Sequence, residues 1–143
     1  WTLLCGDLNC LGTYARLENP HFRQIKRVVP GPYTFVLEAT AEVPRQLHQK
    51  NRRTIGIRIT DDPVAAGLAA ALDGPVVTTS ARVARDEWAL EDAPSIAEQC
   101  AEGVDYLLDA GPLPANPSTV VDVTGAEPVI LRYGAGDPTP FGG

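Results

Sequence analysis

Short apolar stretches rich in β-branched and aromatic residues alternate along this chain with segments that open on a helix cap. Runs of this kind favour buried strands, and turn-forming residues separate most of them. The expected strands are Trp1–Cys5, Tyr33–Leu37, Thr54–Ile59, Val76–Thr79, Val104–Leu108, Ser118–Val123 and Pro128–Leu131. Because helix signals lie between these strands, the chain is expected to form a layered α/β fold.

Four segments carry helix-start signals: an acidic or amide cap, a proline at the first helical position, or both. The expected helices are 8–15, 20–29, 63–72 and 94–102. Asp7 caps the first and Asn19 the second, whereas Asp61 and Asp62 precede the third. The short turn 125–127 between the last two strands allows those strands to run antiparallel.

The composition fits one domain over residues 1–143, because 143 residues with 44% hydrophobic content can bury a core. No apolar run approaches the roughly 20 residues that span a bilayer, and no secretion signal is visible, so a cytoplasmic protein is expected. The chain starts at Trp1 and contains no methionine, which indicates a piece of a longer protein. Three cysteines and two histidines without paired spacing predict reduced thiols and no metal site.

The net charge of −6 conceals a basic front part, with nine Lys/Arg against four Asp/Glu up to residue 60 and three against fourteen beyond it. A locally basic surface on an acidic protein is therefore possible. One short stretch gathers five of these cations: Arg45, Lys50, Arg52, Arg53 and Arg58. This stretch is either a docking place for an anion or a solvated loop before a strand.

Three polar stretches adjoin strand ends, where open α/β sheets collect ligands. Arg58 has apolar neighbours in its strand, which is costly unless its guanidinium meets a phosphate or carboxylate; the alternative is a salt bridge with Asp61 or Asp62. The hydroxyl-rich segment 78–80 follows a strand and can cradle an anion, or serve only as a cap or turn.

The third stretch pairs Ser118 and Thr119, at a strand entrance, with Arg132 near the end of the next strand. If these strands are antiparallel, Ser118 and Arg132 lie side by side, which suits a nucleotide phosphate; the alternative is a cross-strand hydrogen bond without a ligand. The chain lacks a phosphate-binding P-loop, a dinucleotide fingerprint and a nucleophile elbow. Catalysis would then depend on positioning and charge stabilisation, and no catalytic residue is assigned.

Taken in order, five segments resemble the YrdC/TsaC family of threonylcarbamoyl-AMP synthases, which begin threonylcarbamoyladenosine formation in tRNA. These segments are Pro30–Phe35, Thr54–Asp61, Thr78–Ala81, Pro117–Asp122 and Ile130–Gly134. The opening Thr2–Leu8 and the ending Gly136–Phe141 are most similar to the YciO branch. The resemblance covers the whole chain, but the family's N-terminal strand and Lys-x-Arg pair lie ahead of the point where Trp1 aligns.

The resemblance implies a twisted, open mixed sheet with helices packed on it, and a nucleotidyltransferase-like enzyme. Its substrates would be ATP with Mg²⁺, threonine and bicarbonate, and pyrophosphate would be released. The positions that transfer as nucleotide- or substrate-binding residues are Arg58, Ser80, Ser118, Thr119 and Arg132. The family usually has Ser-x-Asn where this chain has Ser80-Ala81-Arg82, so a neutral amide is replaced by a cation. Without the Lys-x-Arg pair, residues 1–143 alone are expected to have weak or no activity.

Two other interpretations stay open at this point. The chain could be a module that binds tRNA or double-stranded RNA without catalysis, with Arg45, Lys50, Arg52 and Arg53 as the contact residues. It could also keep the fold without a ligand and form a homodimer through an exposed sheet edge, because unpaired strand edges tend to pair with another chain.

Overall fold

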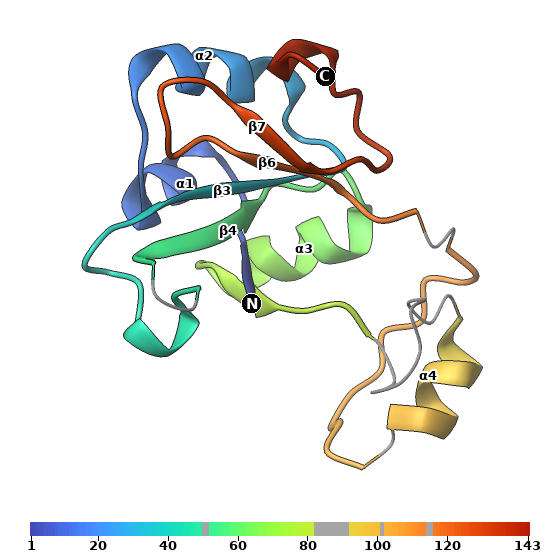
Figure 1. Cartoon of the computed structure of the whole chain (residues 1–143). Helices are drawn as coiled ribbons and strands as arrows, with labels where there is room; N and C mark the ends of the chain where they lie inside the picture. Colours follow the sequence, from blue (N-terminus) through green and yellow to red (C-terminus); the bar gives the residue numbers. More distant parts are fainter. Residues whose placement is uncertain (50–51, 82–91, 101, 114–115) are drawn as a thin grey trace. The chain divides into compact units, whose positions relative to one another are not determined.

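The computed structural model describes residues 1–49, 52–81, 92–100, 102–113 and 116–143. The chain divides into two compact units (Figure 1). The first unit joins Trp1–Thr78 to Pro117–Gly143, and the second is Thr79–Asn116. The single domain expected over residues 1–143 stays a prediction.

A mixed seven-stranded sheet forms the first unit and confirms the predicted α/β class. The strand order is β5-β1-β4-β3-β6-β7, and β2 pairs with β3 beside this path. β1 is parallel to β4 and β3 is parallel to β6, whereas the remaining pairs are antiparallel. The strands are β1 (Thr2–Leu4), β2 (Ala15–Arg16), β3 (Tyr33–Ala39), β4 (Thr54–Arg58), β5 (Val76–Thr78), β6 (Thr119–Asp122) and β7 (Val129–Arg132).

Two of the described helices begin at the acidic caps that the sequence predicts. In α1 (Leu8–Tyr14), the Asp7 carboxylate accepts a hydrogen bond from the Cys10 backbone N–H at 2.8 Å. Asp62 accepts from the Ala65 N–H at 2.8 Å and so caps α3 (Pro63–Ala71). These contacts satisfy backbone donors that a helix start leaves free. The other helices are α2 (Asn19–Val28), α4 (Ala93–Cys100), η1 (Arg45–Leu47) and η2 (Thr139–Phe141).

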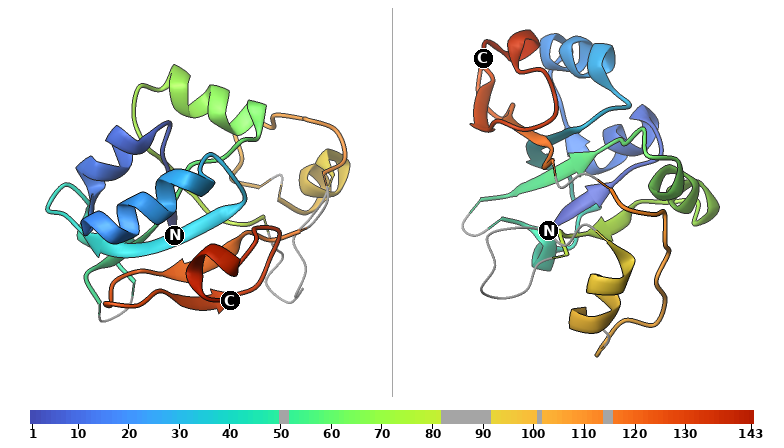
Figure 2. Two further views of the ribbon diagram at one scale, coloured as in Figure 1. Left: turned by 90° about the horizontal axis from the view of Figure 1, so that it is seen from above. Right: turned by 90° about the vertical axis from the view of Figure 1, so that its right-hand side faces the viewer.

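Successive side chains along each strand point to opposite faces of the sheet, so the core and the polar residues separate by alternation. In both views of Figure 2, α1, α2 and α3 lie on the same side of the sheet. The core there joins strand side chains to Leu11 of α1, Ile25 of α2 and Phe141 of η2. The strand residues of this core include Leu3, Tyr33, Phe35, Leu37, Ile55, Ile57 and Val121.

Three sequence expectations differ from the structure. The segment 104–108, expected as a strand, has no regular structure, and its apolar side chains are largely exposed because no strand pairs with it. The two-residue strand β2 was not expected. Glu18, not Asn19, is the cap residue of α2, and it makes no side-chain capping bond.

None of the helices over the described ranges has the length and apolarity that a bilayer crossing requires. The cytoplasmic location expected from the sequence stays a prediction.

Candidate functional site

The candidate site lies on the sheet face opposite the core, which we call the Arg58 face and define by Thr34, Gly56, Arg58 and Ser118. Gly56 adds no side chain to this face, where there is little room for one: a Cβ there would lie 3.3 Å from the Thr2 hydroxyl oxygen and 3.4 Å from a Thr34 methyl carbon. The residues next to Arg58 on this face are therefore small or carry a hydroxyl group. Arg58 is the one residue of β4 on this face with a long, positively charged side chain.

Ser118 connects β3 to β7 through its polar atoms. Its hydroxyl lies 2.7 Å from the Thr34 hydroxyl, and this pair is buried. Arg132 donates through Nε and Nη2 to the Ser118 carbonyl at 3.1 and 2.8 Å, and Nη2 also lies 3.2 Å from the Ser118 hydroxyl. The predicted proximity of Ser118 and Arg132 is thus confirmed, and this contact fixes the direction of the Arg132 guanidinium.

Arg58 ends β4 and is half-buried. Its Nε is buried without a hydrogen-bond partner among the described residues. Burial lowers the pKa of Arg58, the positive charge of Arg132 lowers it further, and the charge of Asp62 opposes the change. Within the part of the chain that the structure describes, Arg58 forms no ion pair with Asp61 or Asp62. A half-buried guanidinium with a free donor beside a second cation favours an anion at this place.

Thr119 lies on the core side and is fully buried. Its hydroxyl donates to the Gly136 carbonyl at 2.6 Å and accepts from the Gly134 N–H at 3.1 Å. Thr119 therefore positions the segment that follows β7, and its predicted contact with a ligand stays a prediction. Ser80 is exposed and belongs to the second unit, so the structure does not join it to Arg58, Ser118 or Arg132.

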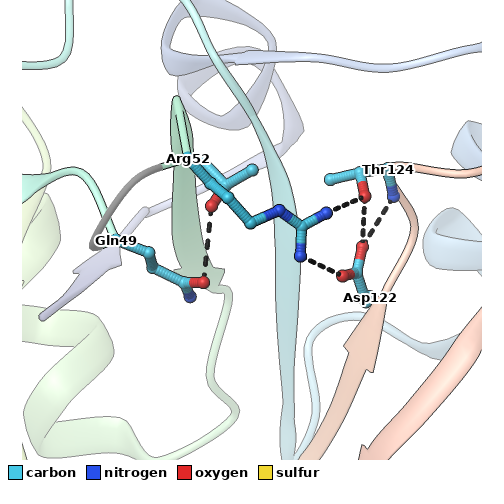
Figure 3. Close-up of polar contacts among 5 residues, drawn as sticks. Gln49, Arg52, Asp122 and Thr124 are labelled. Carbon is cyan, nitrogen blue, oxygen red and sulfur yellow. Dashed lines mark hydrogen bonds and ion pairs between the residues drawn. The ribbon is translucent and has the colours of Figure 1, made fainter.

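The basic stretch around residue 50 is only partly described. Arg45 is exposed on η1, Arg53 is exposed just before β4, and Lys50 lies outside the described residues, as does Arg82. Arg52 pairs with Asp122 at 3.3 Å and donates to the Thr124 hydroxyl at 3.1 Å, as Figure 3 shows. Of the described residues of this stretch, Arg52 is therefore tied to Asp122 of β6 and to Thr124, whereas the role of the stretch as an anion-binding place or a solvated loop stays a prediction.

Burial raises the pKa of Asp122, but hydrogen bonds from Thr124 and the charge and hydrogen bond of Arg52 outweigh it. The net pKa of Asp122 is below its ordinary value. The carboxylate is therefore ionised at neutral pH and holds Arg52 across β3.

Two residues of this face were not expected as site residues. Thr34 lies within a strand that the sequence predicts. Its hydroxyl between two aromatic neighbours is the sequence feature that could have marked it as a site residue. Arg16 lies on β2, whose two residues are too few to produce a periodic pattern. Across the described ranges, no three His, Cys, Asp or Glu side chains come together as a metal site.

Comparisons of sequence and of structure with known proteins point to the same family. The family model Sua5_yciO_yrdC, described as telomere recombination, matches residues 1–134. The uncharacterized protein YciO of Escherichia coli K12 is 41% identical over 141 residues, which is 99% of this chain and 68% of that protein. The crystal structure of E. coli YciO superposes with a TM-score of 0.93 and covers 98% of this chain and 68% of that one.

Threonylcarbamoyl-AMP synthase of Vibrio vulnificus is 32% identical over 84 residues, 57% of this chain and 45% of that protein. The structure of P. abyssi Sua5 complexed with L-threonine has a TM-score of 0.83 at 26% identity, covering 93% of this chain and 40% of that one. Some relatives thus carry the synthase name, whereas the YciO protein that matches 99% of this chain is named as uncharacterized. On the family match, the sequence identity and the shared fold together, the chain belongs to the Sua5/YciO/YrdC family.

Proposed function

We propose that the protein to which this chain belongs is an L-threonylcarbamoyladenylate synthase, which joins ATP, threonine and bicarbonate and releases pyrophosphate. The observation that carries the proposal is the Arg58–Arg132 pair on one sheet face, with a buried, unpartnered Arg58 Nε. The synthase names of more distant relatives and the threonine complex of Sua5 support the substrate class. ATP enters as its magnesium complex, which is substrate and not a resident cofactor.

The proposed chemistry needs charge neutralisation more than a protein nucleophile. The threonine amine attacks the carbon of bicarbonate, and water is lost as the carbamate forms. A carboxylate oxygen of this carbamate then attacks the α-phosphorus of ATP. The bond from this phosphorus to the bridging oxygen breaks, and pyrophosphate leaves with its electron pair. Arg58 and Arg132 would offset the charge of the phosphates, and Ser118 would hold Arg132 in direction.

A pyrophosphate-release assay tests this proposal on the polypeptide as its gene encodes it in full. ATP, threonine and bicarbonate together should release pyrophosphate well above the ATP-only background. Arg58→Gln should lower the rate at least tenfold, because a charge-assisted phosphate contact is lost. Lys26→Gln, which removes an exposed charge on α2, is the matched control and should leave the rate unchanged. Release no greater than the ATP-only background would sink the proposal.

A second candidate is an RNA-binding module without catalysis. It is favoured by the exposure of Arg45 and Arg53 beside the half-exposed Arg52, whose side chain is 55% accessible. Affinity for a double-stranded RNA or a tRNA should then fall steeply with added salt, because phosphate contacts release counterions. It should also fall on loss of Arg53 and stay unchanged on loss of Arg58. RNA retention that is negligible and independent of salt contradicts this candidate.

A further inference from the structure

A basic cavity lies on the Arg58 face, at the opposite ends of the strands from Arg58 itself. It has a volume of about 410 Å³. Its lining residues are Arg16, Glu38, Ala39, Arg52, Arg53, Thr54 and Thr124. We call it the Arg16 cavity. Arginine is thus the commonest residue type in its wall, although only two of the three arginines belong to the stretch that the sequence marked as basic.

The pairing of the strands brings the first of these arginines to the cavity. Arg16 stands opposite Glu38 in the β2–β3 pair, and Glu38 stands opposite Thr54 in the β3–β4 pair. Cross-strand partners project from the same face, so these three residues form a row across the sheet. Residues 38 apart in sequence, Arg16 and Thr54, therefore line one wall.

The other two arginines, Arg52 and Arg53, lie just before β4 and contact residues of β3 and of the β6 end. The Arg53 carbonyl accepts a hydrogen bond from the Ala39 N–H at 2.9 Å, which fixes the backbone just before β4. Arg52 is oriented by Asp122 and Thr124, as Figure 3 shows. A guanidinium carries five N–H donors, so Arg52 keeps donors beyond the two that these contacts use.

The charges of the lining favour an anion with several oxygen atoms. The lining contains three arginines and one acidic residue, Glu38, while the Asp122 carboxylate is occupied with Arg52. The Thr54 and Thr124 side chains add hydroxyl groups to the wall. Guanidinium forks match phosphate oxygens in pairs, and several forks suit phosphate better than a carboxylate with two oxygens.

We propose that the Arg16 cavity binds the phosphate group of a phosphate ester. Its volume exceeds what one inorganic phosphate fills, so the group is carried on a larger molecule, either an RNA backbone or a free phosphorylated compound. The cavity is distinct from the Arg58–Arg132 pair, because Thr54 and Arg58 lie four residues apart on β4, roughly 13 Å. The RNA source rests on the second candidate function, whereas phosphate binding stands without it.

Nuclear magnetic resonance of the chain, titrated with inorganic phosphate and then with adenosine monophosphate, tests the site itself. The backbone signals of Arg16, Glu38, Arg53 and Thr124 should shift in a saturable way in the millimolar range. Arg16→Gln and Arg53→Gln should each weaken this binding about tenfold, since each removes a charged donor. Both side chains are exposed, and unchanged signals of core residues show that the variants keep the fold.

Lys26→Gln is the matched control, because it removes an exposed positive charge away from the lining. It should change the phosphate affinity less than twofold. Equal weakening by all three variants would indicate general charge attraction and overturn the proposal, as would the absence of any saturable shift at the cavity.

Fluorescence anisotropy with a short labelled RNA, run on the same variants, distinguishes the two sources. Parallel losses of RNA and phosphate affinity identify the RNA backbone as the source. Loss of phosphate and adenosine monophosphate binding with unchanged RNA binding identifies a free phosphorylated compound. Failure of RNA binding alone rejects the second candidate function and leaves the cavity proposal supported by the titration.

Discussion

Ser118 shows how closely a binding role and a packing role can share one residue. Its hydroxyl contacts Thr34 at 2.7 Å within the protein, and it contacts Arg132 at 3.2 Å toward the site. Loss of this hydroxyl therefore affects the stability of the fold as well as the direction of a cation.

Ser118→Ala should lower the free energy of unfolding by about 1 kcal/mol, because the Thr34 hydroxyl is left buried without its partner. Thr34→Val combined with Ser118→Ala should recover part of this loss, since neither polar group then remains unpaired. Urea denaturation of the chain, of each single variant and of the double variant measures both effects. If the double variant loses as much free energy of unfolding as the two single variants added together, the two hydroxyl groups do not stabilise each other and the prediction is wrong.

Asp122→Asn should destabilise the protein at neutral pH but not in acid. The folded pKa of Asp122 is lowered from 3.8, so its ionised form contributes stability that is fully present above that value. This contribution is lost as the pH falls through the lower folded pKa. Thermal unfolding should therefore separate Asp122→Asn from the natural chain at pH 7, and the difference should shrink as the pH falls below 3.8. Glu127→Gln, at an exposed position of the β6–β7 turn, should show no such dependence.

At the scale of elements, most strands and helices could be predicted because each carries its own signal. The β-branched runs of β3, β4 and β6 and the acidic cap of α3 are local features that the fold preserves. The short turn before β7 also predicted its antiparallel pairing with β6, which is confirmed.

The remaining features depend on pairing, which a local pattern does not contain. The segment 104–108 has strand-like residues but no partner strand, and β2 exists because residues 38–39 of β3 offer it one. For the same reason the Arg58–Arg132 neighbourhood was partly predictable, whereas the placement of Arg16 beside Arg53 was not. The ligand roles of the predicted site residues stay predictions.

Gly134→Ala should disrupt the junction of β6 and β7. A Cβ at Gly134 would collide with the Pro117 carbonyl oxygen and with backbone atoms of Ser118, which cannot move without shifting β6. A loss of several kcal/mol in the free energy of unfolding is expected, of the order of an overpacked core. Gly67→Ala on α3 is the matched control, because its Cβ meets nothing within 4 Å, and it should stabilise by roughly 0.5–1 kcal/mol. Urea denaturation of both variants decides, and equal effects would contradict the prediction.

At the scale of the whole molecule, the sheet of the first unit has β5 and β7 as its outer strands. On β7 and just beyond it, alternate apolar side chains are more than half exposed, with Val129 at 56%, Leu131 at 55% and Tyr133 at 67%. An outer strand with such a surface invites pairing with another chain.

Residues 1–143 are therefore expected to self-associate through β7. Sedimentation velocity over a wide concentration range should show a dimer that Leu131→Lys reduces, because a charge on an outer strand opposes pairing. Leu72→Lys, at an exposed position after α3, is the matched control and should leave the dimer unchanged. A single monomeric species at every concentration would refute this expectation.

The alternation of core and site residues along β4 has a consequence for how this gene can change. Ile55 and Ile57 are fully buried on the core face, while Gly56 and Arg58 lie on the other. Deleting one codon within this strand would exchange the two faces, turning an isoleucine outward and the arginine into the core. Selection should therefore remove both insertions and deletions within β4. Changes of length at the exposed turn 125–127 should be tolerated among related genes.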